Sequence, residues 1–138
     1  MHSILVQDYM QTAPLAFEQH TNLLQVVHKL LAGKVTGAPV IDTERQVIGF
    51  VSERDCIKEI LHGAFYCEEP AVVGRVMQTD VISFSPSDSI VEIAEIMLQN
   101  LPKNYPVIEN GKLVGLITRS DVLAALLDND EDCYLRQS

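Results

Sequence analysis

Apolar and polar positions alternate along the chain in a pattern that predicts a strand followed by an amphipathic helix. In the stretch Thr79–Phe84 a short apolar run, VISF, is closed by Ser85-Pro86-Ser87, as expected for a strand that ends in a turn. Asp88 or Ser89 then offers a helix cap. Apolar residues follow at spacings of three and four, on one helical face: Ile90, Ile93, Ala94, Met97, Leu98 and Leu101.

Two short apolar segments and a second helix complete this pattern. Tyr105–Ile108 and Lys112–Thr118 are joined by Glu109-Asn110-Gly111, and an Asn-Gly pair between two apolar runs predicts a β-hairpin. A final helix is expected over Asp121–Leu127. The local order is therefore β-α-β-β-α.

The first half of the chain repeats this order, so the sequence is a tandem duplication. A shift of 67, and then of 66, residues superposes identical residues: Val6 on Val73, Met10-Gln11-Thr12 on Met77-Gln78-Thr79, Phe17 on Phe84, Pro39-Val40-Ile41 on Pro106-Val107-Ile108, Gly49 on Gly115, Asp55 on Asp121 and Leu61 on Leu127. In the first copy the apolar helical face is expected at Leu23, Val26, Val27, Leu30 and Leu31. The two strands are expected over Ala38–Ile41 and Val47–Ser52, and the last helix over Asp55–Leu61.

The extent of the two copies predicts the domain organisation. We expect a first repeat over residues 1–63, a linker over 64–70, a second repeat over 71–127 and a solvated acidic tail, which begins DNDED, over 128–138. One unit of three strands and two helices exposes a large apolar face, which a second copy can cover. The predicted fold is α/β, with two βαββα units packed through their sheets into one disc.

Composition narrows the function classes. The chain has 138 residues, 47% of them hydrophobic and 21% charged, which is enough apolar surface for a packed core. Its net charge of −9, without a basic stripe, speaks against nucleic acid as a partner. We find neither a signal peptide nor an apolar run of about 18 residues, so a cytoplasmic protein with no membrane partner is expected. Cys56, Cys67 and Cys133 fit no CxxC pattern and are interpreted as free thiols.

The junction between the last strand and the last helix carries the most chemistry in each copy. Gly49–Asp55 and Gly115–Asp121 both fit G-h-h-[ST]-x-x-D, where h is apolar. One interpretation is a capping box, in which the hydroxyl and the carboxylate satisfy the first amides of the helix. The other adds a ligand: the carboxylate accepts from a vicinal diol such as ribose, the cap binds phosphate, and the glycine leaves room for a close approach.

Over Gln7–Leu127 the chain resembles a pair of cystathionine-β-synthase-type (CBS) domains. The features that carry the resemblance are the Met-Gln-Thr opening of each copy, the apolar-Pro-Val-Ile strand and the junction with its helix. The resemblance implies a stand-alone regulatory module that binds an adenosine-containing ligand between the copies. It would signal to a regulated protein, which the sequence does not identify, by a change in shape or oligomeric contact. AMP is the favoured ligand, ADP, ATP and S-adenosylmethionine are alternatives, and a homodimer is implied.

The resemblance also assigns ligand-binding residues. Asp55 and Asp121 would hold the ribose diol, and Ser52 and Thr118 would help with phosphate or ribose. Backbone groups of Thr12–Leu15 and Thr79–Ile82, including Pro14 and Val81, would read the base. The residues around the start of the second strand would lie near base or phosphate: Thr36, Gly37 and Ala38 in the first copy, and Lys103, Asn104, Tyr105 and Pro106 in the second. Tyr105 is either a base-stacking residue or a core aromatic.

Charge at the two junctions differs. Arg54 precedes Asp55, whereas Ser120 precedes Asp121 and the cations of the second copy are Arg119 and Lys103. We therefore rank the Asp55 junction as the more tolerant of anions. Few cations favour AMP or an S-adenosyl compound over ATP.

Two alternatives remain open. The chain could be an interaction or dimerisation scaffold that binds no ligand, with junctions that are only capping boxes. It could also be a metal- or redox-responsive module, although His2, His20, His28 and His62 lack ligand spacing and no metal site is expected. Catalysis is not expected, because the duplicated carboxylates do not form a differentiated acid and base.

Overall fold

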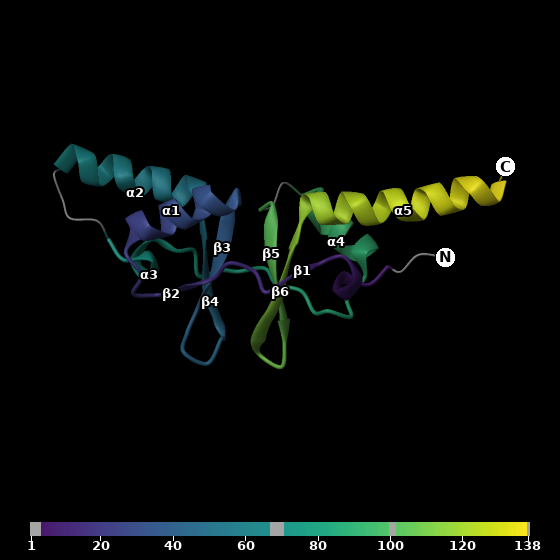
Figure 1. Ribbon diagram of the computed structural model, residues 1–138, viewed down its shortest axis with the longest axis horizontal. Coiled ribbons are helices and arrows are strands. Elements are labelled where there is room, and N and C mark those ends of the chain that lie inside the picture. The colour runs from purple at the N-terminus through teal and green to yellow at the C-terminus, as the bar shows by residue number, and fades with distance from the viewer. Residues whose placement is uncertain (1–3, 67–70, 100–101, 138) are drawn as a thin grey trace. The chain divides into compact units, whose positions relative to one another are not determined.

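A computed structural model describes residues 4–66, 71–99 and 102–137, and their side chains over 4–63, 71–99 and 102–130. The chain forms two compact units, and each is discontinuous in sequence (Figure 1). Unit 1 combines the chain up to Ala13 with Ile82–Glu109 and with the chain from Val114 onward. Unit 2 comprises Pro14–Val81 and Asn110–Leu113.

Unit 2 contains a three-stranded sheet and two long helices. Its elements are β2 (Phe17–Glu18), α1 (Leu23–Gly33), β3 (Gly37–Ile41), β4 (Val47–Ser52), α2 (Glu53–Tyr66) and α3 (Val73–Val76). The strand order is β2-β3-β4, with β2 parallel and β4 antiparallel to β3. Asn22 caps α1, because its side-chain oxygen accepts from the Leu24 amide at 2.8 Å.

Unit 1 also combines a three-stranded sheet with helices, although its short strand pairs at the opposite edge of the hairpin. Its elements are the 3-10 helix η1 (Val6–Asp8), β1 (Gln11–Thr12), α4 (Ile90–Met97), β5 (Asn104–Glu109), β6 (Lys112–Thr118) and α5 (Arg119–Gln137). The strand order is β1-β6-β5, and β1 is antiparallel to β6. Ser89 is the cap of α4, and positive φ angles at Asn110 (53°) and Gly111 (79°) form the predicted hairpin turn. The prediction of an α/β fold of two βαββα repeats is confirmed.

Three predicted boundaries are corrected. The strand expected over Thr79–Phe84 is reduced to one parallel bridge between Phe84 and Val107. Helix α2 continues to Tyr66, through the first residues of the expected linker, whereas Cys67–Pro70 lie outside the described residues. Helix α5 continues to Gln137, so the expected tail from residue 128 is helical. The chain contains neither Gly nor Pro after Leu127, so it has no helix-breaking residue there.

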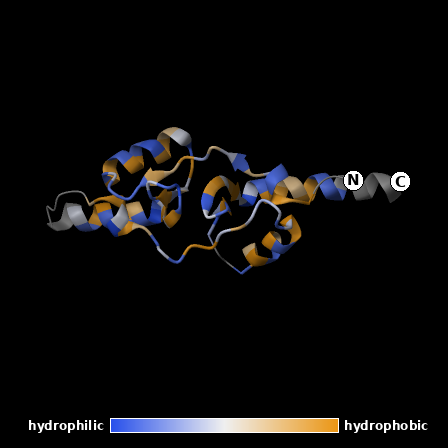
Figure 2. Ribbon diagram, turned by 90° about the horizontal axis from the view of Figure 1, so that it is seen from below, coloured by the Kyte–Doolittle hydropathy of each residue, from blue (hydrophilic) through white to orange (hydrophobic). Residues whose placement is uncertain are grey.

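Each unit encloses its own core, built from equivalent positions of the two repeats. The pairs are Val73 and Val6, Phe17 and Phe84, Leu23 and Ile90, Val26 and Ile93, Val40 and Val107, Val51 and Ile117, and Cys56 and Val122. Burial of each large apolar side chain stabilises its unit by about 1.5–3 kcal/mol. Hydrophilic and hydrophobic residues alternate around the helices, as the amphipathic pattern predicts (Figure 2).

The opening segments of the two repeats are exchanged. Val6 precedes the first repeat's strands in the sequence but lies in the core of unit 1, and Val73 lies in the core of unit 2. Backbone hydrogen bonds show the same exchange twice. The Val6 amide donates to the Asp88 carbonyl at 3.0 Å, and 67 residues away the Val73 amide donates to the Thr21 carbonyl at 2.8 Å. Each opening segment therefore completes the unit that the other repeat mainly builds.

Candidate functional site

The strand-to-helix junction of unit 2 is a closed capping box. Oδ2 of Asp55 accepts hydrogen bonds from the Ser52 amide and the Ser52 hydroxyl, both at 2.9 Å. In return the Asp55 amide donates to Ser52 Oγ at 3.2 Å. The three bonds hold the half-buried carboxylate at the start of α2, where the helix dipole favours negative charge.

The junction of unit 1 has the same geometry. Oδ2 of Asp121 accepts from the amide and hydroxyl of Thr118, both at 2.9 Å, and the Asp121 amide donates to Thr118 Oγ1 at 3.2 Å. The capping-box interpretation is confirmed in both units. A capping box does not exclude a ligand, because an ionised carboxylate has about four acceptor positions.

A glutamine from the exchanged opening segment contacts each carboxylate. Gln78 Nε2 donates to Oδ1 of Asp55 at 3.0 Å, and Gln11 Nε2 donates to Oδ2 of Asp121 at 3.3 Å. Sequence reasoning used the Met-Gln-Thr openings as repeat markers and missed this role. The signal was the identity of the two openings, because Gln11 and Gln78 occupy equivalent positions.

The junction glycines make room for protein rather than for a ligand. A Cβ at Gly49 would meet the Met77 side chain and would lie 2.9 Å from the Gln78 carbonyl oxygen. At Gly115 it would lie 2.6 Å from Met10 Sδ and 2.9 Å from the Gln11 carbonyl oxygen. The expectation that these glycines leave the strand end bare is therefore wrong, because the exchanged segment packs against it.

The residues before β3 and β5 accept hydrogen bonds from the first amides of α2 and α5, respectively. The Thr36 carbonyl accepts from the Glu53 amide at 2.9 Å, and the Lys103 carbonyl accepts from the Arg119 amide at 3.0 Å. With the Asp55 amide bonded to Ser52, two of the first three amides of α2 are engaged inside the protein. At most the Arg54 amide is left among them for an anion, so phosphate binding at this helix start depends on exposed side chains.

Four residues expected to contact ligand are buried. Gly37, Ala38, Tyr105 and Pro106 lie in the protein interior, and Tyr105 is only 1% exposed. The Tyr105 ring packs on Phe84 with 5.1 Å between centroids, so the core alternative for its side chain is confirmed. Burial raises the pKa of its hydroxyl, and nearby Arg119 opposes the rise. Any ligand contact from these four residues would have to come from the backbone.

The remaining expected residues are more accessible. Arg54, Arg119, Lys103, Thr36, Thr12 and Thr79 are exposed, and Asn104, Pro14 and Val81 are half-buried. Thr12 lies opposite Gly115 in the β1–β6 pair, so it belongs with the Asp121 junction. Thr79 follows Gln78, which bridges to Phe50 beside the Asp55 junction. The exchange thus pairs each segment that was expected to read the base with the junction of the other repeat.

The metal and redox alternative depends on the placement of His, Cys, Asp and Glu side chains. In the parts of the chain with described side chains, no group of three or more His, Cys, Asp and Glu could hold a metal ion. Cys56 is a buried free thiol, and burial together with Asp55 and Glu53 raises the pKa of this thiol. His2, Cys67 and the side chain of Cys133 lie outside the described part. No described helix is long and apolar enough to cross a membrane.

Comparison with protein families assigns the chain. The CBS domain family matches residues 6–62 and again 73–128, which is most of the chain. The protein therefore belongs to the CBS domain family and contains a CBS pair.

Known relatives share the fold over nearly the whole chain. CBSX2 of Arabidopsis thaliana, solved in complex with AMP, is 27% identical with a TM-score of 0.81, covering 93% of this chain and 99% of that one. AcuB of Vibrio cholerae is 28% identical with a TM-score of 0.81, covering 99% and 98%. An uncharacterized protein of Methanocaldococcus jannaschii is 28% identical over 121 residues, which are 88% of this chain and 42% of that protein. Aquifex aeolicus A-adding tRNA nucleotidyltransferase is 30% identical over 126 residues, but the chain spans only 15% of its length.

Proposed function

We propose that the chain is a regulatory module that binds AMP, or a related adenosine compound, at its two junctions and signals to a partner protein. The observation that carries this proposal is the carboxylate at each helix start, Asp55 and Asp121, held in one orientation by the capping box. A fixed carboxylate at the protein surface suits the two adjacent hydroxyls of a ribose. The AMP complex of CBSX2, a relative of similar length, supports an adenosine ligand.

Charge favours a single phosphate. Arg54 at one junction and Lys103 and Arg119 at the other are exposed, but the whole chain carries −9. The first amides of α2 are largely engaged by Thr36 and Ser52, so few backbone donors are left for further phosphates. AMP therefore fits these junctions better than ATP. We also propose that the module acts as a homodimer and that it is regulatory rather than catalytic.

Thermal unfolding with ligands tests the proposal. The wild type is heated with AMP, ADP, ATP and S-adenosylmethionine, and the ligand-induced shift is compared with those of Asp55→Ala and Asp121→Ala. A ligand at 100 times its dissociation constant stabilises the folded state by about 2.7 kcal/mol. We expect AMP to give the largest shift in the wild type and each Asp variant to lose part of it.

Asp88→Ala is the matched control. The Asp88 carboxylate also accepts a local backbone hydrogen bond, from Ser85 at 2.7 Å, but it lies outside the junctions. Each variant is compared with its own ligand-free form, because loss of a cap alone costs about 1 kcal/mol. A shift that persists in both junction variants would contradict the site, and no shift with any adenosine compound would contradict the ligand class.

A scaffold without ligand is the second candidate, and the capping boxes favour it. The bonds within Ser52–Asp55 and Thr118–Asp121 account for the junction residues without any ligand. The thermal series separates the two candidates, because a scaffold would show no adenosine-dependent shift while it still forms its protein contacts.

A further inference from the structure

The two junction carboxylates differ in how many of their oxygens the protein already engages. In unit 2 the capping box uses Oδ2 of Asp55, and Gln78 Nε2 donates to Oδ1 at 3.0 Å. In unit 1 the capping box and Gln11 Nε2 all meet Oδ2 of Asp121, and the Gln11 bond is 3.3 Å long. Among the described residues of unit 1, no donor meets Oδ1 of Asp121. Asp55 therefore has both oxygens engaged, whereas Asp121 has one.

The backbone places both glutamines in the same way. The Gln78 amide donates to the Phe50 carbonyl and the Phe50 amide donates to the Gln78 carbonyl, both at 2.8 Å. Gln11 lies opposite Leu116 in the antiparallel β1–β6 pair, and Leu116 is 66 residues after Phe50. The difference between the units therefore lies in the side chains. The same residue type at the same place in the repeat bonds Oδ1 in one unit and Oδ2 in the other.

A ribose diol has to find acceptor positions for two hydroxyls. An ionised carboxylate offers about four such positions, about two on each oxygen. Oδ1 of Asp121 can accept both hydroxyls while every protein bond to this carboxylate is kept. At Asp55 the Gln78 amide occupies one of the positions on Oδ1, so the second hydroxyl must displace it. That displacement breaks a hydrogen bond to a charged group, which is stronger than a neutral one.

We propose that Gln78 competes with the ligand for Asp55, so that an adenosine compound fills the unit 1 junction before the unit 2 junction. This inference rests on the proposed function and adds an order of filling to its two sites. Loss of one exposed hydrogen bond corresponds to an affinity lower by about threefold. The module therefore responds to one ligand over two concentration ranges, and ligand at unit 2 releases the Gln78 side chain from Asp55.

Phosphate adds a separate preference, which the choice of ligand removes. Arg54 precedes Asp55, whereas Ser120 precedes Asp121, so the two junctions attract an anion differently. Adenosine carries the diol without a phosphate and reports the competition with Gln78 alone. The compound 2′-deoxyadenosine keeps one of the two hydroxyls, and one hydroxyl finds an acceptor position on either carboxylate without displacing Gln78.

Isothermal titration calorimetry on single-junction variants measures each site alone. Asp55→Ala leaves the unit 1 junction, and Asp121→Ala leaves the unit 2 junction. We expect adenosine to bind Asp55→Ala about threefold more tightly than Asp121→Ala. With 2′-deoxyadenosine the difference should fall below about 1.5-fold, because Gln78 then keeps its bond to Asp55.

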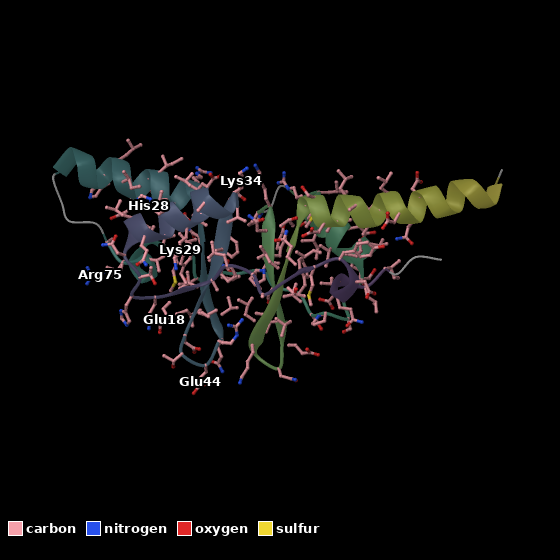
Figure 3. All side chains as sticks on the ribbon, in the orientation of Figure 1. Glu18, His28, Lys29, Lys34, Glu44 and Arg75 are labelled. Carbon is pink, nitrogen blue, oxygen red and sulfur yellow. The ribbon has the colours of Figure 1, made fainter. Side chains whose placement is uncertain are left out.

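A change of Gln78 in the Asp121→Ala background tests the competition directly. Gln78→Ala removes the donor and should raise the adenosine affinity of the unit 2 junction by about threefold. Gln78→Asn shortens the side chain by one methylene group and should act in the same direction. Gln25→Ala is the matched control, because Gln25 is an exposed glutamine of unit 2 on α1, one turn before His28 and Lys29 (Figure 3). It should bind adenosine like its parent.

The intact chain gives a second measurement that needs no junction variant. The Ser52 amide donates to Asp55 and the Thr118 amide donates to Asp121, so their NMR signals report the two carboxylates separately. In a titration of the wild type with adenosine, the Thr118 signal should reach half of its total shift at about one third of the adenosine concentration that the Ser52 signal needs.

Four results would overturn the order of filling. They are adenosine binding in Asp121→Ala that equals or exceeds binding in Asp55→Ala, a preference that persists with 2′-deoxyadenosine, a Gln78→Ala change that leaves the affinity the same or lowers it, and a Ser52 signal that shifts first. In each case adenosine still binds, so the proposed function stands and only the role of Gln78 is wrong. If neither adenosine nor AMP binds any sample, the proposed function itself is wrong, and the order of filling fails with it.

Discussion

Unit 1 and unit 2 share a backbone scaffold but differ in what the scaffold carries. The capping boxes of Ser52 and Thr118 have the same three distances, and the exchanged opening segments make equivalent hydrogen bonds. In contrast, Ala38 of unit 2 is replaced in unit 1 by Tyr105, whose ring fills the core. Backbone geometry and capping are the duplicated features, whereas the core side chains, most of all Ala38 and Tyr105, and the surface charges differ between the two units.

Gln78 and Gln11 extend this contrast to the site. In unit 2 both oxygens of Asp55 are engaged, Oδ2 by Ser52 and Oδ1 by Gln78. In unit 1 Gln11 meets Oδ2 of Asp121, the oxygen that Thr118 also uses, and at the longer distance of 3.3 Å. A ribose hydroxyl would compete with Gln78 for Oδ1 of Asp55, so we expect the two junctions to bind a ligand with different affinities.

Tyr105→Ala should give the largest effect, because it removes a core residue that unit 2 does not have. The cavity beside Phe84 should lower the free energy of unfolding by about 3–5 kcal/mol, measured by urea denaturation followed by circular dichroism. Tyr105→Phe is the control. It keeps the ring, and the hydroxyl it removes is buried with no hydrogen-bond partner among the described residues. It should be neutral or stabilise by up to about 1 kcal/mol, and a clear loss would show that the hydroxyl has a partner.

Gly49→Ala and Gly115→Ala should destabilise both units to a similar extent. In each case the new methyl group meets the backbone carbonyl of the exchanged segment at 2.9 Å, so the segment must shift, at a cost of about 1–3 kcal/mol in the same denaturation assay. Gly33→Ala is the matched control, because its nearest atom is 3.9 Å away and alanine favours the helix. Two junction variants as stable as this control would mean that the opening segments do not pack against these strands.

Gln78→Ala should have the smallest effect on stability, and it should raise the affinity for AMP. Loss of one exposed hydrogen bond to Asp55 should cost about 0.5–1 kcal/mol of unfolding free energy. AMP affinity, measured by isothermal titration calorimetry, should rise about threefold at that junction, because Oδ1 becomes available to the ribose. Gln11→Ala is the parallel variant in unit 1. Weaker binding in Gln78→Ala would indicate instead that the glutamine holds the carboxylate in its binding orientation.

Much of the local structure could be predicted because it depends on neighbours in sequence. The Asn110-Gly111 turn, the Ser89 cap and the box of Ser52 with Asp55 each need residues only a few positions apart. The prediction of a strand over Thr79–Phe84 is wrong for the same reason, because it considered only neighbours in the sequence. Its apolar run satisfied the local pattern, but only Phe84 found a strand partner, Val107, in the fold.

The sequence by itself determined the repeat, the order of its elements and the capped carboxylate at each junction, since short-range spacing specifies these features. Only the tertiary structure decided which opening segment completes which unit, because Val6 and Val73 find their partners across long stretches of chain that leave no periodic signal. That exchange explains why Gly49 and Gly115 must be small and why Gln78 and Gln11 reach the carboxylates.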